Sequence, residues 1–177
     1  MKHFLKLAFA IAIIAAAYVT LSAFIANKKT KTNAAAPYNI VLVTKNSVGS
    51  NTEWTWSVTN PNPGNGSNGT LQNVSHWDVV LPPQAEATLV SASYSFDGVN
   101  WTNSPIVVER DPSIKFCTLM DVLKFDAGTS GSAPTYYRAV FSSDFLLNPF
   151  ATSWIKTGGG QQGCNFYYYT GMGLRLD

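Results

Sequence analysis

The chain has 177 residues, of which 12% are charged, and it carries twelve Lys and Arg against ten Asp and Glu. Five of the twelve basic residues precede residue 37, which leaves seven basic and ten acidic residues, a net charge of −3, in the rest of the chain. Those seven basic residues are scattered rather than clustered, and this excludes the basic stripe of a nucleic-acid-binding protein.

The first 26 residues have the pattern of a membrane-targeting segment. Lys2 and Lys6 form a short basic start, and the run from Leu7 to Ala26 contains no charged residue. This order is typical of a secretory signal peptide, but about 20 apolar residues are also long enough to cross a bilayer as a helix. We therefore expect residues 1–26 to be either a cleaved signal peptide or a retained membrane anchor, and we expect no other membrane contact.

The rest of the chain is interpreted as one exported domain behind a linker. Residues 27–36 are polar and rich in Ala, as expected of a linker. Residues 37–177 have the length of a single domain, since about 140 residues are enough to bury a substantial core. We expect this domain to be secreted or held at the cell surface, outside the cytoplasm.

After residue 36, apolar side chains recur at every second position rather than at helical spacing. Trp54, Trp56 and Val58 fall on one face of segment 53–59, opposite polar residues, and this alternation indicates a half-buried strand with the tryptophans in the core. Comparable runs predict strands at 38–44, 53–59, 73–81, 88–96, 106–109, 113–118, 135–142, 154–156 and 165–170. Segment 119–125 is ambiguous and can hold a helical turn, and 145–149 is interpreted as an irregular turn.

Turn-forming residues separate these runs. NPNPGNGSNG at 60–69 predicts a long exposed loop, Pro82 and Pro83 end a strand, and Asp97-Gly98 forms a tight turn. Many short strands at intervals of about ten residues, without helices between them, predict an all-β fold. We expect an antiparallel β-sandwich of about eight strands with Greek-key connections.

Both cysteines, Cys117 and Cys164, lie in the predicted domain. Outside the cytoplasm, paired thiols tend to become disulfides. We expect a Cys117–Cys164 disulfide, and the alternative is a pair of reduced buried cysteines.

The sequence predicts no catalytic residue and no cofactor. His76 and Asp78 share one face of segment 73–81, but the adjacent Ser75 points to the opposite face, and no G-x-S-x-G motif occurs. We therefore interpret His76 as a strand histidine held by a neighbour. The competing hypothesis is a small secreted carbohydrate-active hydrolase that uses paired carboxylates.

The sequence also predicts no metal site. Two Cys and the single His of the domain are too few for a Cys/His zinc cage. Asp97, Asn100 and Asp126 offer calcium-type oxygens, but they lack EF-hand spacing. We expect Asp97 instead to cap its own hairpin turn.

Aromatic residues make up 13% of the chain, and all five Trp lie in the predicted domain. Tyr167, Tyr168 and Tyr169 are consecutive, so a strand there places aromatic rings on both of its faces. We predict a contact surface for a glycan or a surface protein formed by these tyrosines, Trp154 and the loops at 62–69 and 158–163. The alternative is that the rings pack against neighbouring strands.

Several short segments, taken in order, carry a resemblance: WTWSVTN (54–60), SHWDVVLP (75–82), DG (97–98) before Trp101, VLKFD (122–126), YYRAVF (136–141) and IKTG (155–158). This layout is similar to a loose group of secreted bacterial β-sandwich modules. The resemblance implies an extracellular sandwich without established enzymatic activity, in which His76 looks like part of the framework. We therefore expect a non-enzymatic binding or structural and adhesive module at the cell surface, with a self-associating subunit of a surface appendage as a further alternative.

Overall fold

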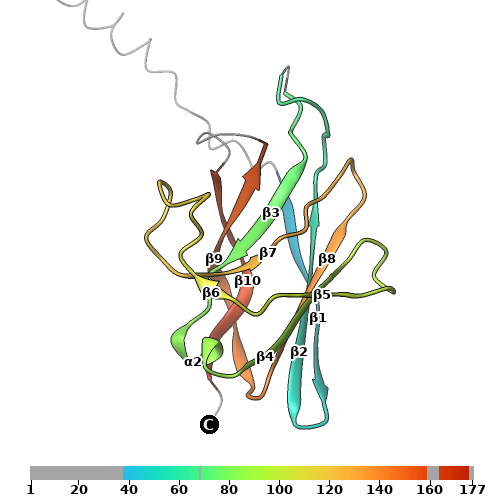
Figure 1. Cartoon of the computed structure of the whole chain (residues 1–177). Helices are drawn as coiled ribbons and strands as arrows, with labels where there is room; N and C mark the ends of the chain where they lie inside the picture. Colours follow the sequence, from blue (N-terminus) through green and yellow to red (C-terminus); the bar gives the residue numbers. More distant parts are fainter. Residues whose placement is uncertain (1–37, 68, 159–163, 176–177) are drawn as a thin grey trace, which may run out of the picture. The chain divides into compact units, whose positions relative to one another are not determined.

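Two antiparallel sheets of five strands each make up the described part of the chain (Figure 1), which comprises residues 38–67, 69–158 and 164–175 of this computed structural model. The first sheet has the order β1 (Asn39–Val48), β2 (Asn51–Thr59), β8 (Thr135–Phe141), β4 (Leu89–Ser95), β5 (Thr102–Ser104). The second has the order β10 (Cys164–Arg175), β9 (Phe145–Thr157), β3 (Val74–Val79), β7 (Val122–Phe125), β6 (Val108–Glu109). The predicted all-β sandwich is confirmed, with ten strands in the described part of the chain instead of about eight.

The predicted targeting segment 1–26 and linker 27–36 lie outside the described residues. Where the chain is described, it forms no helix with the length and hydropathy that a bilayer span requires. The described residues all belong to the compact unit Ala36–Asp177. A single helical turn, α2 (Pro83–Glu86), follows β3 at the place where the sequence predicts only the end of a strand.

Strand β9 begins earlier than the sequence predicts, because a bulge accommodates Pro149. The β9–β10 pairing shifts register between Tyr169 and Gly171, opposite Asn148 to Ala151. Proline lacks an N–H and is tolerated in sheets mainly at bulges and edges. The Asn148 side chain also accepts a hydrogen bond from the Phe150 N–H at 2.9 Å. Segment 145–149 is therefore part of a strand, and its interpretation as an irregular turn is wrong.

The predicted strand at 113–118 is also wrong, whereas the ambiguous segment 119–125 contains strand β7. Backbone hydrogen bonds from Ile114 to Asp111 and from Cys117 to Ile114 make residues 111–118 a series of turns. We call residues 110–120 the covering loop, because it lies over the outer face of the second sheet. Ile114 packs there with Val122 and Trp154 in a small second core.

Aromatic rings fill the main core between the sheets. Trp54, Trp56 and Trp77 are fully buried, as the alternation predicts. Trp56 stacks on Trp54 at 5.8 Å and meets Trp77 edge-on at 5.9 Å. Such pairs contribute about 0.5–1.5 kcal/mol each beyond the apolar area that they bury.

The predicted disulfide between Cys117 and Cys164 is confirmed. It joins the covering loop to the first residue of β10, across 47 positions of the chain. The covering loop begins after β6, at one edge of the second sheet, and the disulfide attaches it to β10, at the other edge.

Candidate functional site

Exposed aromatic rings gather on the outer face of β9 and β10. Phe150, Phe166 and Tyr168 are 71%, 47% and 63% exposed. The register of the two strands sets Phe166 opposite Trp154 and Tyr168 opposite Thr152. We call Phe150, Phe166 and Tyr168 the aromatic surface.

The rings of the aromatic surface are arranged edge to face. The Phe166 and Tyr168 rings lie 4.9 Å apart at 84°, and the Phe150 and Tyr168 rings lie 6.3 Å apart at 85°. Trp154 is buried beneath the covering loop, and its ring meets Phe166 at 5.4 Å and 65°. The surface is therefore a set of ridges and slots rather than a flat platform.

The prediction that Tyr167 and Tyr169 contribute to a contact surface is wrong, because both side chains are only 3% exposed. Tyr169 packs on Trp56 and Trp77 in the main core, and Tyr167 meets Tyr38 at 6.2 Å. Burial raises the pKa of both phenols. Tyr168 is the member of the trio that faces outward, and Trp154 supports the surface from below instead of forming its top.

The two loops predicted to join the contact surface are described only in part. Residues 62–67 are exposed, whereas residues 68 and 159–163 lie outside the described residues. The base of the first loop is held by the buried Asn60, whose Nδ2 donates to the carbonyls of Leu71 and Gln72 at 3.1 and 3.0 Å.

The calcium candidates Asp97, Asn100 and Asp126 have other partners. Asp97 Oδ1 accepts hydrogen bonds from the N–H groups of Asn100 and Val99 at 2.7 and 2.8 Å, and its Oδ2 accepts one from Asn100 Nδ2. The Asn100 N–H, followed by that of Val99, holds the pKa of Asp97 well below its usual range. Asp126 pairs with Lys124 at 3.5 Å. The prediction that Asp97 caps its own turn is confirmed.

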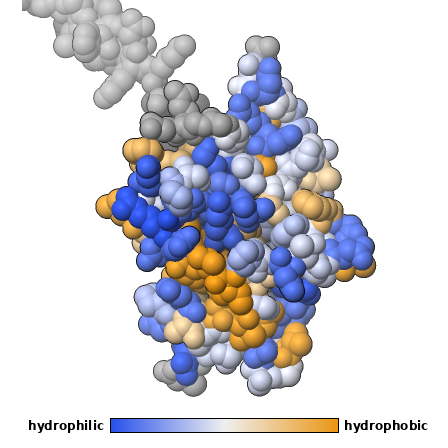
Figure 2. All heavy atoms as spheres, viewed as in Figure 1, coloured by the Kyte–Doolittle hydropathy of each residue, from blue (hydrophilic) through white to orange (hydrophobic). Residues whose placement is uncertain are grey.

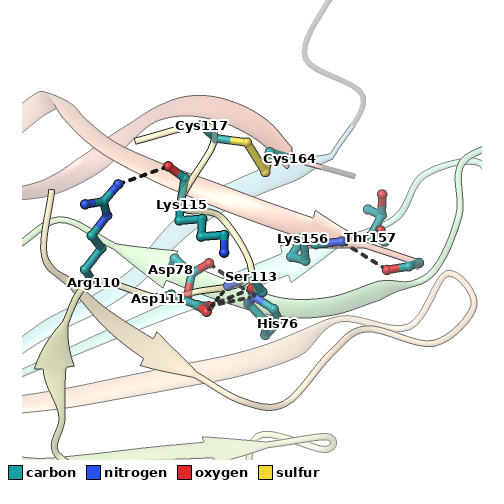
Figure 3. Close-up of a disulfide and its surroundings, with 11 residues drawn as sticks. His76, Asp78, Arg110, Asp111, Ser113, Lys115, Cys117, Lys156, Thr157 and Cys164 are labelled. Atoms are coloured by element: carbon teal, nitrogen blue, oxygen red, sulfur yellow. Dashed lines mark hydrogen bonds and ion pairs between the residues drawn. A yellow bond between two sulfur atoms is a disulfide. The ribbon is translucent and has the colours of Figure 1, made fainter. Parts of the chain in front are cut away.

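A buried polar cluster lies on the same outer face, beneath the covering loop. Figure 3 shows His76 and Asp78 of β3 and Asp111 and Ser113 of the covering loop pointing toward one another beside the disulfide. His76 Nε2 lies 3.3 Å from Asp78 Oδ2, 3.1 Å from Asp111 Oδ2 and 3.1 Å from Ser113 Oγ. His76, Asp78 and Asp111 are all buried.

This cluster does not have the geometry of a Ser-His-Asp triad. In a triad, the hydroxyl and the carboxylate contact different ring nitrogens of the histidine. Here Asp78, Asp111 and Ser113 all contact Nε2 of His76. The sequence predicts that a neighbour holds His76, but gives no signal for Asp111 or Ser113, because both reach it from a distant loop.

The two carboxylates of the cluster differ in their electrostatics. Burial raises the pKa of Asp78, and the nearby His76, 3.3 Å away, offsets this only in part. Burial also acts to raise the pKa of Asp111, but hydrogen bonds from the N–H and hydroxyl of Ser113, with the charge of Lys124, outweigh it and lower that pKa. Lys124 Nζ lies 3.5 Å from Asp111 Oδ2.

Two surface depressions border the cluster. One of about 320 Å³ is lined by Ser75, His76, Ser113, Lys156 and Gly158. The other, of about 290 Å³, is lined by Pro105, Val107, Glu109, Asp111, Pro112, Lys124 and Asp126. Figure 2 shows hydrophilic and hydrophobic residues mixed over the covering loop, which exposes Phe116, Leu119 and Met120, and an apolar patch near β6. Solvent therefore approaches the cluster from two sides.

No family model, curated protein or solved structure matches this chain.

Proposed function

We propose that this chain is an exported, non-enzymatic module that binds a protein partner through the aromatic surface of Phe150, Phe166 and Tyr168. One observation carries the proposal: three contiguous exposed rings stand on two strands that bear almost no charge. Strands β9 and β10 contain only Lys156 and Arg175 as charged residues. Enrichment in aromatic residues and depletion of charge characterise the cores of protein interfaces.

Ring geometry favours a protein partner over a glycan. A sugar ring stacks on a flat exposed aromatic face and needs polar groups nearby for its hydroxyls. The exposed rings here are nearly perpendicular to one another, and two of the three belong to Phe, which has no polar group. Apolar side chains of a protein partner fit the slots between such rings.

The position of β10 supports a partner that presents an apolar extended segment. Within the described sheet, β10 is an edge strand whose neighbour is β9. Edge strands can accept an added strand from another chain, with side-chain pockets that give specificity. Phe166 and Tyr168 lie on this strand and would contact the segment's side chains.

Export rests on three supports. The disulfide between Cys117 and Cys164 is compatible with an oxidising, extracytoplasmic compartment. The apolar segment 1–26 has the pattern of a signal peptide or anchor, and the resemblance to secreted modules points the same way.

Tyr168→Ala tests the proposal, with Phe96→Ala as the matched control. Phe96 is equally exposed at 63%, but it follows β4 of the other sheet. Cell-envelope proteins of the source cell are captured on the full chain, and the affinity of a captured, purified protein is then measured by calorimetry. We expect Tyr168→Ala to weaken its binding about tenfold or more and Phe96→Ala to leave it unchanged.

Two results would replace the proposal with an alternative. Retention on a polysaccharide panel that is lost in Tyr168→Ala would assign the surface to a glycan. Concentration-dependent dimers or multimers in light scattering that are lost in the same variant would assign it to self-association.

A further inference from the structure

We propose that His76, Asp78 and Asp111 bind one divalent metal ion of the zinc class beneath the covering loop. This site is independent of the aromatic surface. Nε2 of His76 and one carboxylate oxygen from each Asp lie within 4.8 Å of one another, and all three residues are buried. Among the described residues, no other group of three His, Cys, Asp or Glu comes this close together.

The spacing of the ligand atoms fits a small cation. Ligand atoms about 2.0–2.2 Å from a tetrahedral Zn²⁺ lie about 3.3–3.6 Å from one another. His76 Nε2 is 3.3 Å from Asp78 Oδ2 and 3.1 Å from Asp111 Oδ2, so small side-chain rotations open the site. Ser113 Oγ, 3.1 Å from the same nitrogen, stands where a fourth ligand or a bound water would be.

The cluster has too few hydrogen-bond donors for the oxygen atoms around His76. Three oxygens surround Nε2, which carries at most one hydrogen, and the hydroxyl of Ser113 already donates to Asp111 Oδ2 at 2.9 Å. Asp78 is fully buried, and neither of its carboxylate oxygens, including the Oδ2 that faces His76 Nε2, has a hydrogen-bond partner among the described residues. Buried carboxylate oxygens without partners are costly and rare. A divalent cation in place of the Nε2 proton would give Asp78 the missing partner.

The surrounding charges permit a cation. The two negative charges of the carboxylates, with a neutral imidazole, balance the two positive charges of a divalent ion. Lys124 Nζ lies 3.5 Å from Asp111 Oδ2, but it lies equally far from Asp126 Oδ1. Lys124 is about one-third exposed, so it can turn fully toward Asp126 when an ion occupies the site.

The donor set selects the zinc class over calcium. An imidazole nitrogen with two carboxylates suits Zn²⁺ and related transition-metal ions. Calcium takes six to eight oxygen ligands, whereas the cluster offers a nitrogen, two carboxylates and one hydroxyl. The depression lined by His76 and Ser113 supplies a route for the ion.

Zn²⁺ titration of the full chain tests the site. Untagged protein with its disulfide formed is stripped with chelator and titrated by calorimetry, with metal content measured by mass spectrometry. We expect one Zn²⁺ per chain, and about a hundredfold weaker binding in Asp78→Asn and in His76→Gln. Asp121→Asn, an exposed carboxylate outside the cluster, serves as the control and should bind like wild type.

Lys124→Gln keeps the proposal testable if the buried variants fold poorly. This substitution removes the ammonium group of Lys124, which competes with the metal ion for Asp111, and should therefore strengthen Zn²⁺ binding about two- to fivefold. The Nε2 resonance of His76 should shift on Zn²⁺ addition, a change that a purely structural ion pair does not give. Absence of saturable Zn²⁺ binding, an unmoved His76 resonance, unchanged affinity in folded Asp78→Asn, or tighter binding of Ca²⁺ than of Zn²⁺ would each overturn the proposal.

Discussion

Asp78 on β3 and Trp154 on β9 stand opposite each other in the register of the second sheet. On the outer face of this sheet, the pair marks the boundary between the buried polar cluster and the aromatic surface. On one side, Trp154 supports the ring of Phe166 and the exposed aromatic surface. On the other side, Asp78 contacts His76 in the buried polar cluster. Ile114 of the covering loop packs with Trp154, so a change in this loop reaches both sides of the boundary.

Removal of the disulfide should destabilise the domain and loosen the covering loop. In the chain-entropy model, closing a loop across 47 positions stabilises the fold by about 4 kcal/mol. We expect the Cys117→Ser/Cys164→Ser double variant to lose about 2–4 kcal/mol in urea unfolding. Trp154 should become more accessible to a fluorescence quencher. An unchanged urea midpoint would show that the loop is held by its other contacts.

The disulfide and the proposed zinc site should be coupled, because Asp111 belongs to the covering loop. We expect the same double serine variant to bind Zn²⁺ about tenfold more weakly, on the scale of other supporting interactions at metal sites. Serine variants are preferred to reduction, because free thiolates bind zinc themselves. If calorimetry gives equal Zn²⁺ affinities for the wild type and the double variant, the local turn alone positions Asp111.

Two buried tyrosines should respond in opposite ways to the loss of their hydroxyls. Tyr137 donates to the carbonyl of Ala127 at 2.7 Å, so Tyr137→Phe should cost about 1–2 kcal/mol of unfolding free energy. The hydroxyl of Tyr169 is buried without a hydrogen-bond partner among the described residues. Tyr169→Phe should therefore be neutral or slightly stabilising. Urea unfolding of both variants checks this, and equal losses would contradict it.

Asp97 should contribute to stability only above acid pH. Its pKa is lowered in the folded state, chiefly by the N–H of Asn100, and the ordinary unfolded value is about 3.9. A lowered folded pKa gives stability that is present above the unfolded pKa and is lost as the pH falls through the folded value. Urea midpoints of wild type and Asp97→Asn should differ most above about pH 5 and converge as the pH falls below about 4. A difference that grows in acid would contradict this.

Gly128 should tolerate no side chain, because β3 begins against its backbone. A Cβ at this position would overlap the carbonyl oxygen of Val74, and that residue's N–H bonds to Thr129. We expect Gly128→Ala to cost about 3 kcal/mol or more, since the backbone must move. Gly131→Ala is the control: it has open space but a φ of 66°, so about 1 kcal/mol is expected. Similar losses in both variants in thermal unfolding would contradict the proposed overlap.

Local sequence pattern determined most of the strands, the burial of Trp54, Trp56 and Trp77, and the Asp97 turn. Alternation at every second residue assigns Trp54 and Trp56 to one face, and the side chain of Asp97 caps its turn with groups only two and three residues away. The disulfide was also predictable, because the domain contains just two cysteines. Each of these features depends on spacing or composition that a single sequence displays directly.

Tertiary structure alone decided which aromatic rings are exposed and what surrounds His76. Alternation shows that Tyr168 and its neighbours face opposite ways, but only the packing of the first sheet against the second decides which face is the core. Pro149 lies within a strand because β9 itself carries an extra residue there, a bulge in its pairing with β10. Asp111 and Ser113 reach His76 from 35 and 37 positions away, and contacts over such separations leave no periodic trace in the sequence.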